Sequence, residues 1–189
     1  TIYDAEGLIS IDNNLIIFTK NRAKKITEFY SIPKEEGKYD AKKIGTLKTN
    51  SIITGADYSQ ELGLLALTST VNFNEYYLIT VKDFYLSKTN NYTITGDNVL
   101  FGNGHQSWFS DKILLLNDTY QDNEYYRHLM IFNAEDNTFD FIGKFYSFYN
   151  DSVFRCDLHP RLSKNNKFLA IDSAHKENRK IILIKIEKD

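Results

Sequence analysis

Histidine, arginine and aspartate side chains gather near the C-terminal end of the chain in a pattern that could do chemistry. The stretch 157–186 carries two of each around a short apolar segment. Neutral imidazoles bind divalent metal ions and can accept protons, and a guanidinium clamps a carboxylate with two parallel hydrogen bonds. We therefore expect His159, Arg161 and His175 to be the candidate catalytic residues.

A second group of the same kind lies earlier in the chain. His105 precedes an apolar segment that ends at Asp118, and Tyr120 follows it closely. Asp172 ends the apolar segment that follows His159 in the same way. The expected substrate-binding residues are His105, Asp118, Tyr120 and Asp172. The expected ligands of a divalent metal ion are His105, His159 and His175.

Each of these residues also has a structural interpretation. Aspartate and serine, as at Asp172 and Ser173, cap turns and bond to nearby backbone. No spacing of the His-Glu-x-x-His type is present, and Cys156 near His159 fits a small buried side chain better than a nucleophile. Bonding between neighbouring elements therefore stays open as the alternative to a site.

The elements that would position these residues form an internal repeat. Four segments beginning at Glu6, Gly55, His105 and His159 align without a gap, and their starts lie 49, 50 and 54 residues apart. Each has a short entry, a polar turn and an apolar strand that ends at a polar residue in one shared column. A second apolar strand follows each. The four residues of the shared column are Thr19, Thr68, Asp118 and Asp172.

A unit of this length with about four strands is typical of a β-propeller blade. One blade has two apolar faces and buries them only by packing against its neighbours. We predict an all-β chain, a single β-propeller domain over 1–189, with four visible blade repeats at about 4–50, 51–98, 99–150 and 151–189. The fourth repeat ends at its third strand. Residues 1–3 would supply its missing outer strand and close a four-bladed ring, or the chain is part of a larger propeller. A sandwich is the alternative fold.

In such a blade, the loop into the first strand and the loop after the second open on one face. His159 and Arg161 would begin a first strand, and Asp172, Ser173 and His175 would lie in the loop after the second. The histidines and aspartates would then meet near one rim. The first two repeats carry other residues at the equivalent positions, namely Glu6, Lys20, Asp57 and Thr68.

The second half resembles TolB-type propellers, and in particular the oligogalacturonate lyase-like variant. The resemblance covers about 102–187 and rests on four elements: Gly104, His105 and Ser107; Asp118, Thr119 and Tyr120; His159, Pro160 and Arg161; and Asp172, Ser173 and His175. Gln106 and Ala174 stand where the pattern has proline and threonine. The first half is similar, through its "EGL" and "TGADYS" elements, to other secreted or lipoprotein propellers.

The resemblance implies a function as well as a fold. A lyase of this type implies a manganese-like ion, held by histidines and an amide, that neutralises a uronate carboxylate beside the abstracted proton. Arg161 would clamp a carboxylate and a histidine would act as the base. It also favours a secreted or periplasmic bacterial location over the cytoplasm.

The charge, hydropathy and cysteine content of the chain argue against several other classes of function. A net charge of -2 disfavours nucleic-acid binding, and no apolar run is long enough to span a bilayer. The single cysteine excludes an internal disulfide framework and a zinc site built from several thiolates. The chain lacks an initiator methionine, so we expect a processed form, a trimmed chain or a fragment. Two hypotheses remain: a carbohydrate-associated propeller that binds a sugar acid, or a non-catalytic scaffold that binds a protein partner.

Overall fold

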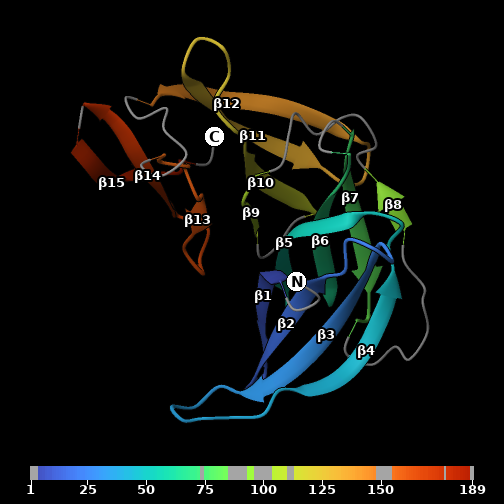
Figure 1. Cartoon of the computed structure of the whole chain (residues 1–189). Coiled ribbons are helices and arrows are strands. Elements are labelled where there is room, and N and C mark those ends of the chain that lie inside the picture. Colours follow the sequence, from blue (N-terminus) through green and yellow to red (C-terminus); the bar gives the residue numbers. More distant parts are fainter. Residues whose placement is uncertain are drawn as a thin grey trace. The chain divides into compact units, whose positions relative to one another are not determined.

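The described part of the computed structural model consists of β-strands and loops (Figure 1). It describes residues 4–72, 75–84, 93–95, 104–109, 113–147, 155–176 and 178–187. These ranges contain no helix, and hence no helix long and apolar enough to cross a membrane. The predicted all-β class is confirmed.

The strands form four antiparallel sheets, and within each sheet the strands follow one another in chain order. Sheet A contains β1 (Asp4–Ile11), β2 (Asn14–Lys20), β3 (Ile26–Pro33) and β4 (Lys42–Lys48). Sheet B contains β5 (Ile52–Ser59), β6 (Leu64–Val71), β7 (Glu75–Lys82) and β8 (Thr93–Thr95). Sheet C contains β9 (Gln106–Trp108), β10 (Leu114–Asp118), β11 (Tyr126–Asn133) and β12 (Thr138–Tyr146). Sheet D contains β13 (Arg161–Leu162), β14 (Phe168–Lys176) and β15 (Asn178–Lys185).

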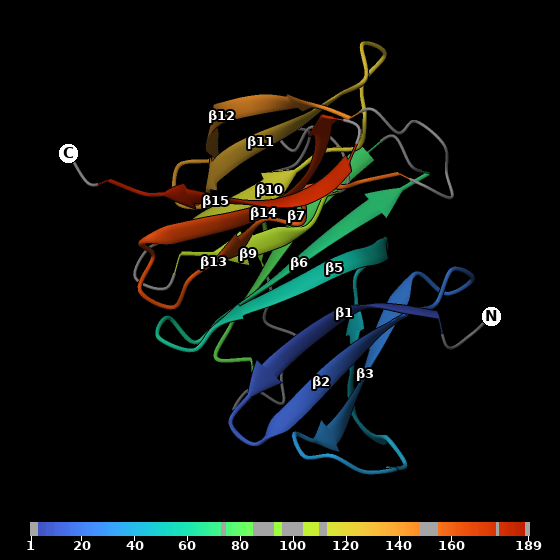
Figure 2. The ribbon, with the colours of Figure 1, turned by 90° about the vertical axis from the view of Figure 1, so that its left-hand side faces the viewer.

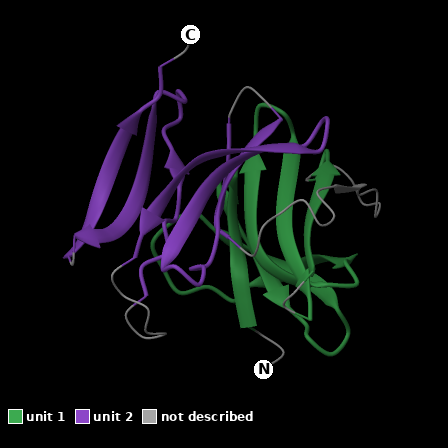
Figure 3. Ribbon diagram, turned by 90° about the horizontal axis from the view of Figure 1, so that it is seen from above, with its two compact units in different colours: residues 1–100 green, residues 101–189 purple. Residues whose placement is uncertain are grey.

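Each of the four sequence repeats thus gives one sheet, and the aligned apolar segment is its second strand. The shared polar column lies in that strand in all four sheets. The chain divides into two compact units, residues 1–100 with sheets A and B and residues 101–189 with sheets C and D (Figure 3). The arrangement of the four repeats as a single domain stays a prediction.

The core of unit 1 lies between sheets A and B. Ile16 and Phe18 of β2 pack in one cluster with Leu65 and Leu67 of β6, and all four are fully buried. A Cβ atom at Gly7 would lie 2.9 Å from the Cβ of Ala56, closer than real Cβ atoms approach one another. Glycine is therefore needed where β1 and β5 meet.

The core of unit 2 lies between sheets C and D. Leu116 of β10 and Leu129 of β11 pack with Leu169 and Ile171 of β14. In the repeat alignment, Leu116 is equivalent to Ala170 rather than to Leu169. Sheets C and D therefore meet through opposite faces of equivalent strands, as repetition around an axis requires.

In unit 1, sheets A and B pack against each other through other faces than sheets C and D do. Ile16 and Leu65 are equivalent in the repeat, yet both lie in the same core. Sheets A and B thus meet through equivalent faces, which repetition of the sequence alone does not predict.

Sheet D has three strands among the described residues (Figure 2). The prediction that the fourth repeat ends at its third strand agrees with this count. Residues 1–3, which we expected to supply a closing strand, lie outside the described residues.

Candidate functional site

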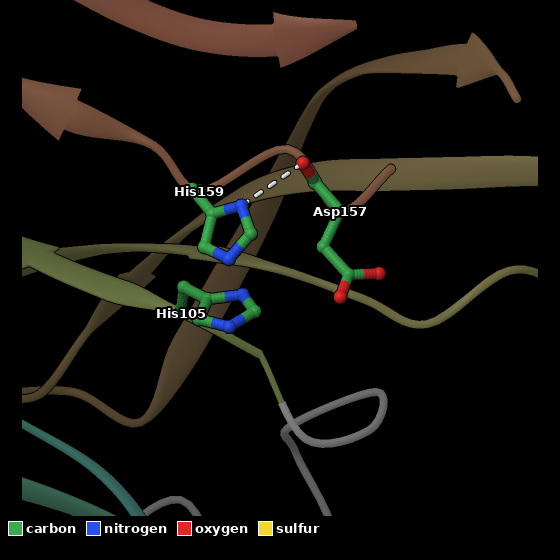
Figure 4. A group of neighbouring side chains, drawn as sticks. All are labelled: His105, Asp157 and His159. Atoms are coloured by element: carbon green, nitrogen blue, oxygen red, sulfur yellow. Dashed lines mark hydrogen bonds between the residues drawn. The ribbon is translucent and has the colours of Figure 1, made fainter. Parts of the chain in front are cut away.

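The two histidines that begin equivalent repeats lie against one another in unit 2. His105 immediately precedes β9, and His159 lies two residues before β13. Their ring centroids are 3.8 Å apart, with 42° between the ring planes (Figure 4). The predicted proximity of these two imidazoles is thus present, because each first strand starts at the same end of its sheet.

Asp118 holds the backbone of both histidines. Its carboxylate accepts the backbone N–H of His105 at 2.5 Å and that of His159 at 3.0 Å. The Asp118 side chain is only 1% exposed. Since the two bonds start from different sheets, Asp118 joins sheet C to the entry of sheet D. A further bond from the Leu162 N–H to the Ser107 hydroxyl, 3.2 Å long, does the same.

The same side of each imidazole ring is anchored. Nδ1 of His159 lies 3.1 Å from the Asp157 carbonyl oxygen and 3.4 Å from the Asp172 carboxylate. Nδ1 of His105 lies 3.2 Å from the Asp118 carboxylate. A proton on Nδ1 satisfies both arrangements and leaves Nε2 of each ring to a ligand. His159 has a φ of 43°, in the left-handed region that histidine adopts more readily than most residues.

Asp157 lies beside the histidine pair (Figure 4) and is held by two arginines. Its carboxylate is 2.7 Å from Nη1 of Arg127 and 3.0 Å from Nε of Arg155. Arg127 and Asp157 are both buried, whereas the Arg155 side chain is 48% exposed. Buried charges of this kind are tolerated only when they are paired.

Arg161 and Asp172 form the adjacent pair. Nη2 of Arg161 donates to the Asp172 carboxylate at 2.9 Å, and the Arg161 side chain is 53% exposed. The same carboxylate oxygen faces His159. Asp172 therefore connects the predicted arginine to one of the predicted histidines.

Charge is layered in this site. The carboxylates are buried or nearly so, with side-chain exposures of 1%, 5% and 17%, whereas the basic groups are 36% to 53% exposed. The carboxylates belong to Asp118, Asp157 and Asp172, and the basic groups to His105, His159, Arg155 and Arg161. The side chains of this site that reach solvent are consequently basic ones, each paired with a more deeply buried carboxylate.

The pKa of His105 favours its protonated, positively charged form. Burial lowers the pKa of its imidazole, but the hydrogen bond and negative charge of Asp118 outweigh burial, with a further contribution from Asp157. The net pKa of His105 is raised, although Arg155 opposes the shift. A larger fraction of His105 is therefore protonated near neutral pH than of an ordinary histidine.

Tyr120 adds an exposed aromatic ring beside the basic groups. Tyr120 is 45% exposed, and the guanidinium carbon of Arg155 lies 5.1 Å from the ring centroid. This distance is that of a cation–π contact. Tyr120 thus lies on the same surface as Arg155, and its role in substrate binding stays a prediction.

Asp172, Ser173 and His175 do not lie in a loop, contrary to the prediction. β14 runs through all three to Lys176, because its pairing with β15 continues past a register shift between Ser173 and Lys176. Nδ1 of His175 lies 2.6 Å from the Ser173 hydroxyl. His175 remains exposed, but the cluster of ligand atoms contains Asp157 beside His105 and His159 instead of His175.

The sequence reasoning missed three residues of the site: Arg127, Arg155 and Asp157. Arg127 could have been singled out from the sequence, since this charged residue interrupts the apolar third strand of its repeat. Cys156, by contrast, is buried as expected, and burial raises the pKa of its thiol. A raised pKa does not suit a nucleophilic thiolate.

The donor set fits a divalent metal ion in part. One ligand atom each from His105, His159 and Asp157 lie within 4.8 Å of one another (Figure 4). Metal-binding histidines usually donate their second N–H to a carbonyl or carboxylate, and Nδ1 of each ring has such an acceptor within reach here. The two imidazoles fit a metal ion, whereas Asp157 already neutralises two arginines.

The equivalent positions of sheet A carry different chemistry. Lys20, which follows the shared column, is buried and forms an ion pair with Glu6. Thr19 of that column exchanges hydrogen bonds with the backbone of Glu28. The histidine chemistry is confined to the second half of the chain.

Comparison with known proteins supports the fold. No family model matches the chain, and no curated protein matches it in sequence. The structure is similar to that of oligogalacturonate lyase in complex with manganese, with 12% identity over 94% of this chain and 46% of that one and a TM-score of 0.65. It is also similar to a structure described as a putative TolB from Agrobacterium tumefaciens, with 13% identity over 98% of this chain and 59% of that one and a TM-score of 0.62. Hydrazine synthase from Kuenenia stuttgartiensis gives 8% identity over 97% and 51%, with a TM-score of 0.56.

The chain spans about half the length of these structures. At such low identity the likeness concerns the fold and leaves activity open. Four antiparallel sheets in chain order and these neighbours agree with the resemblance found in the second half of the sequence. The fold of this chain is therefore that of the TolB-type and oligogalacturonate lyase-like β-propellers.

Proposed function

We propose that unit 2 binds an acidic sugar through the basic surface formed by His105, His159, Arg155 and Arg161. The observation that carries the proposal is the layering of charge: the acids are buried or nearly so, and the bases other than Arg127 are exposed. A uronic acid supplies a carboxylate for such a surface. It does not need to displace a neighbouring exposed carboxylate to bind.

The individual residues suit distinct parts of a uronate. Arg161 is the most exposed of the four basic side chains and uses Nη2 on Asp172, so its other N–H groups can bind a carboxylate. Tyr120 offers a ring face on which a sugar can stack. Nε2 of His105 and of His159 point away from their anchoring acids and can bind hydroxyl groups.

A more specific form of this proposal is that the site also cleaves the acidic sugar as a lyase. Removing the proton next to the uronate carboxylate requires a base and stabilisation of the negative charge that develops. His159, with Nδ1 anchored, is the better-placed base, and Arg161 would bear the charge. A divalent ion held by His105 and His159 would also stabilise that charge, but it would occupy Nε2 of His159, so in a metal-dependent form of the reaction His159 would not be the base.

Calorimetric titration with trigalacturonate tests the proposal, with galactotriose as the uncharged counterpart. We expect the parent to bind trigalacturonate, and Arg161→Gln and His159→Gln to bind it at least tenfold more weakly, since a charge-assisted hydrogen bond contributes about 1.5–3 kcal/mol. Arg22→Gln is the matched control, because Arg22 is a similarly exposed arginine, paired with Asp4 in unit 1. Equal binding of the neutral sugar, or an unchanged affinity of Arg161→Gln, would contradict the proposal.

Repeating the titration with manganese and with a chelator separates the contribution of a metal ion from that of the protein side chains. If affinity or lyase activity rises with manganese in the parent but not in the His105→Gln variant, the histidine pair holds the ion. If neither metal nor uronate binds, the scaffold alternative is favoured. The bonds from Asp118 and Ser107 across the sheets already suit that role.

A further inference from the structure

The two oxygens of the buried Asp157 carboxylate have different surroundings. Oδ2 lies 3.0 Å from Nε of Arg155. Oδ1 lies 2.7 Å from Nη1 of Arg127, but the two groups are not aligned as a hydrogen bond, and Oδ1 accepts no hydrogen bond from any residue that the structure describes. A buried carboxylate oxygen without a hydrogen bond is unfavourable, so this oxygen calls for a ligand of its own.

Two imidazoles complete a set of three metal ligands with this carboxylate. One ligand atom each of His105, His159 and Asp157 lie within 4.8 Å of one another (Figure 4). Ligand atoms of one zinc ion are about 3–3.5 Å apart in a tetrahedral site, so the set would close by up to about 1.5 Å on binding. Two histidines and one carboxylate leave further coordination positions open and are typical of zinc and iron(II) sites.

Arg155 and a metal ion would compete for the same carboxylate. A divalent ion beside Asp157 would repel the guanidinium that now neutralises it. Of the two arginines, Arg127 is enclosed, with a side chain 2% exposed, whereas the Arg155 side chain is 48% exposed. Arg155 is therefore the partner that can leave, and Arg127 is the one that stays.

We propose that the histidine pair and Asp157 form a divalent-metal site, and that the ion replaces Arg155 at the carboxylate. Without the ion, Arg155 neutralises an acid whose burial would otherwise be unfavourable. With the ion, the Nε–H group of Arg155 is released from Asp157 and becomes available to an acidic ligand. The site thus holds one of two cations at a time. The exchange concerns the metal ion alone, so it stands or fails separately from the sugar-binding function.

The donor set also predicts which ions bind. The affinity of nitrogen and oxygen sites for divalent ions rises from Mn²⁺ through Co²⁺, and Zn²⁺ also binds more tightly than Mn²⁺. Co²⁺ and Zn²⁺ should therefore bind more tightly than Mn²⁺. Ca²⁺ should bind least, because it takes six to eight oxygen ligands.

Calorimetric titration of the complete chain with Co²⁺ alone tests the ligand set. We expect the parent to bind the ion, and His105→Gln and Asp157→Asn to bind it at least tenfold more weakly. His175→Gln is the control for a histidine outside the set and should leave the affinity unchanged. A parent that binds no ion, or a loss in His175→Gln that equals the loss in His105→Gln, would overturn the site.

The same titration tests the exchange. Arg155→Gln should bind Co²⁺ at least threefold more tightly than the parent, because no guanidinium then competes for the carboxylate. Arg161→Gln is the matched control, since it also removes an exposed positive charge near the histidine pair, but its partner Asp172 is outside the ligand set. An equal gain in the two variants would show a general effect of charge and contradict the exchange.

A magnetic resonance measurement on the isotope-labelled parent keeps a misfolded Asp157→Asn variant from deciding the matter. The Nε–H signal of Arg155 is identified by its absence from Arg155→Gln. When Zn²⁺ is added, solvent exchange of this N–H should quicken at least tenfold, while the signal of the buried Arg127 keeps its exchange rate. If saturating Zn²⁺ leaves the Arg155 signal unchanged, the ion does not replace this arginine and the proposal is wrong.

Discussion

Asp118 accepts the backbone N–H of His159 at 3.0 Å, across 41 residues of sequence. The same carboxylate accepts the N–H of His105, so one buried acid fixes the two loops that carry the histidine pair. The geometry of the candidate site and the joining of sheets C and D therefore depend on one side chain.

Replacing Asp118 should weaken unit 2. The Asp118→Asn substitution keeps the size of the side chain but removes its charge, and it turns an N–H group toward a backbone donor. A lost charge-assisted bond in a buried position costs about 2–3 kcal/mol. Urea unfolding should show a lower midpoint with an unchanged slope. Asp140→Asn, at an exposed position of β12, is the control and should leave the midpoint unchanged.

The raised pKa of His105 predicts how stability depends on pH. The folded protein binds the proton more tightly than the unfolded chain, whose histidine has a pKa near 6.5. The stabilisation by protonated His105 is therefore complete below about pH 6.5 and is lost as the pH rises through the folded pKa.

His105→Gln measures this contribution. The difference in unfolding free energy between parent and variant should be largest near pH 5.5 and should shrink by pH 8.5. In an Asp118→Asn background, where the acid that raises the pKa is gone, the pH dependence should largely disappear. A difference that grows as the pH rises would show that the sign of the shift is wrong.

The buried Arg127–Asp157 pair should be costly to break from either side. Arg127→Met leaves Asp157 with Arg155 alone, and removing one partner of a buried pair costs about 3 kcal/mol. The double variant Arg127→Met/Asp157→Leu should recover part of that loss, because no buried charge remains unpaired. Arg155→Gln, at an exposed position, should cost less than about 1 kcal/mol by denaturant titration. A double variant no more stable than Arg127→Met would argue against a charge effect.

The sheets and the histidine pair could be predicted from the sequence because both depend on local pattern and on repetition. Apolar strands separated by polar turns predict each sheet, and equivalent positions in successive repeats place His105 beside His159. The position of His175 could not be predicted, because it depends on a register shift against β15. Asp157 was missed for a related reason: its partner Arg127 comes from another sheet, and one sequence carries no signal for that pairing.

Gly104 offers the sharpest test of the close packing beneath the site. A Cβ atom there would lie 1.7 Å from the carbonyl oxygen of Asp118 and 2.7 Å from Oδ1 of Asn117. Because the first obstacle is backbone, β10 itself must move, so Gly104→Ala should cost about 3 kcal/mol and also weaken trigalacturonate binding. At Gly143 the nearest side-chain atom would be 3.7 Å away, so Gly143→Ala should change stability by less than about 1 kcal/mol. Calorimetric unfolding of the two variants compares them directly, and equal stability would show that β10 and the loop before β9 do not pack this closely.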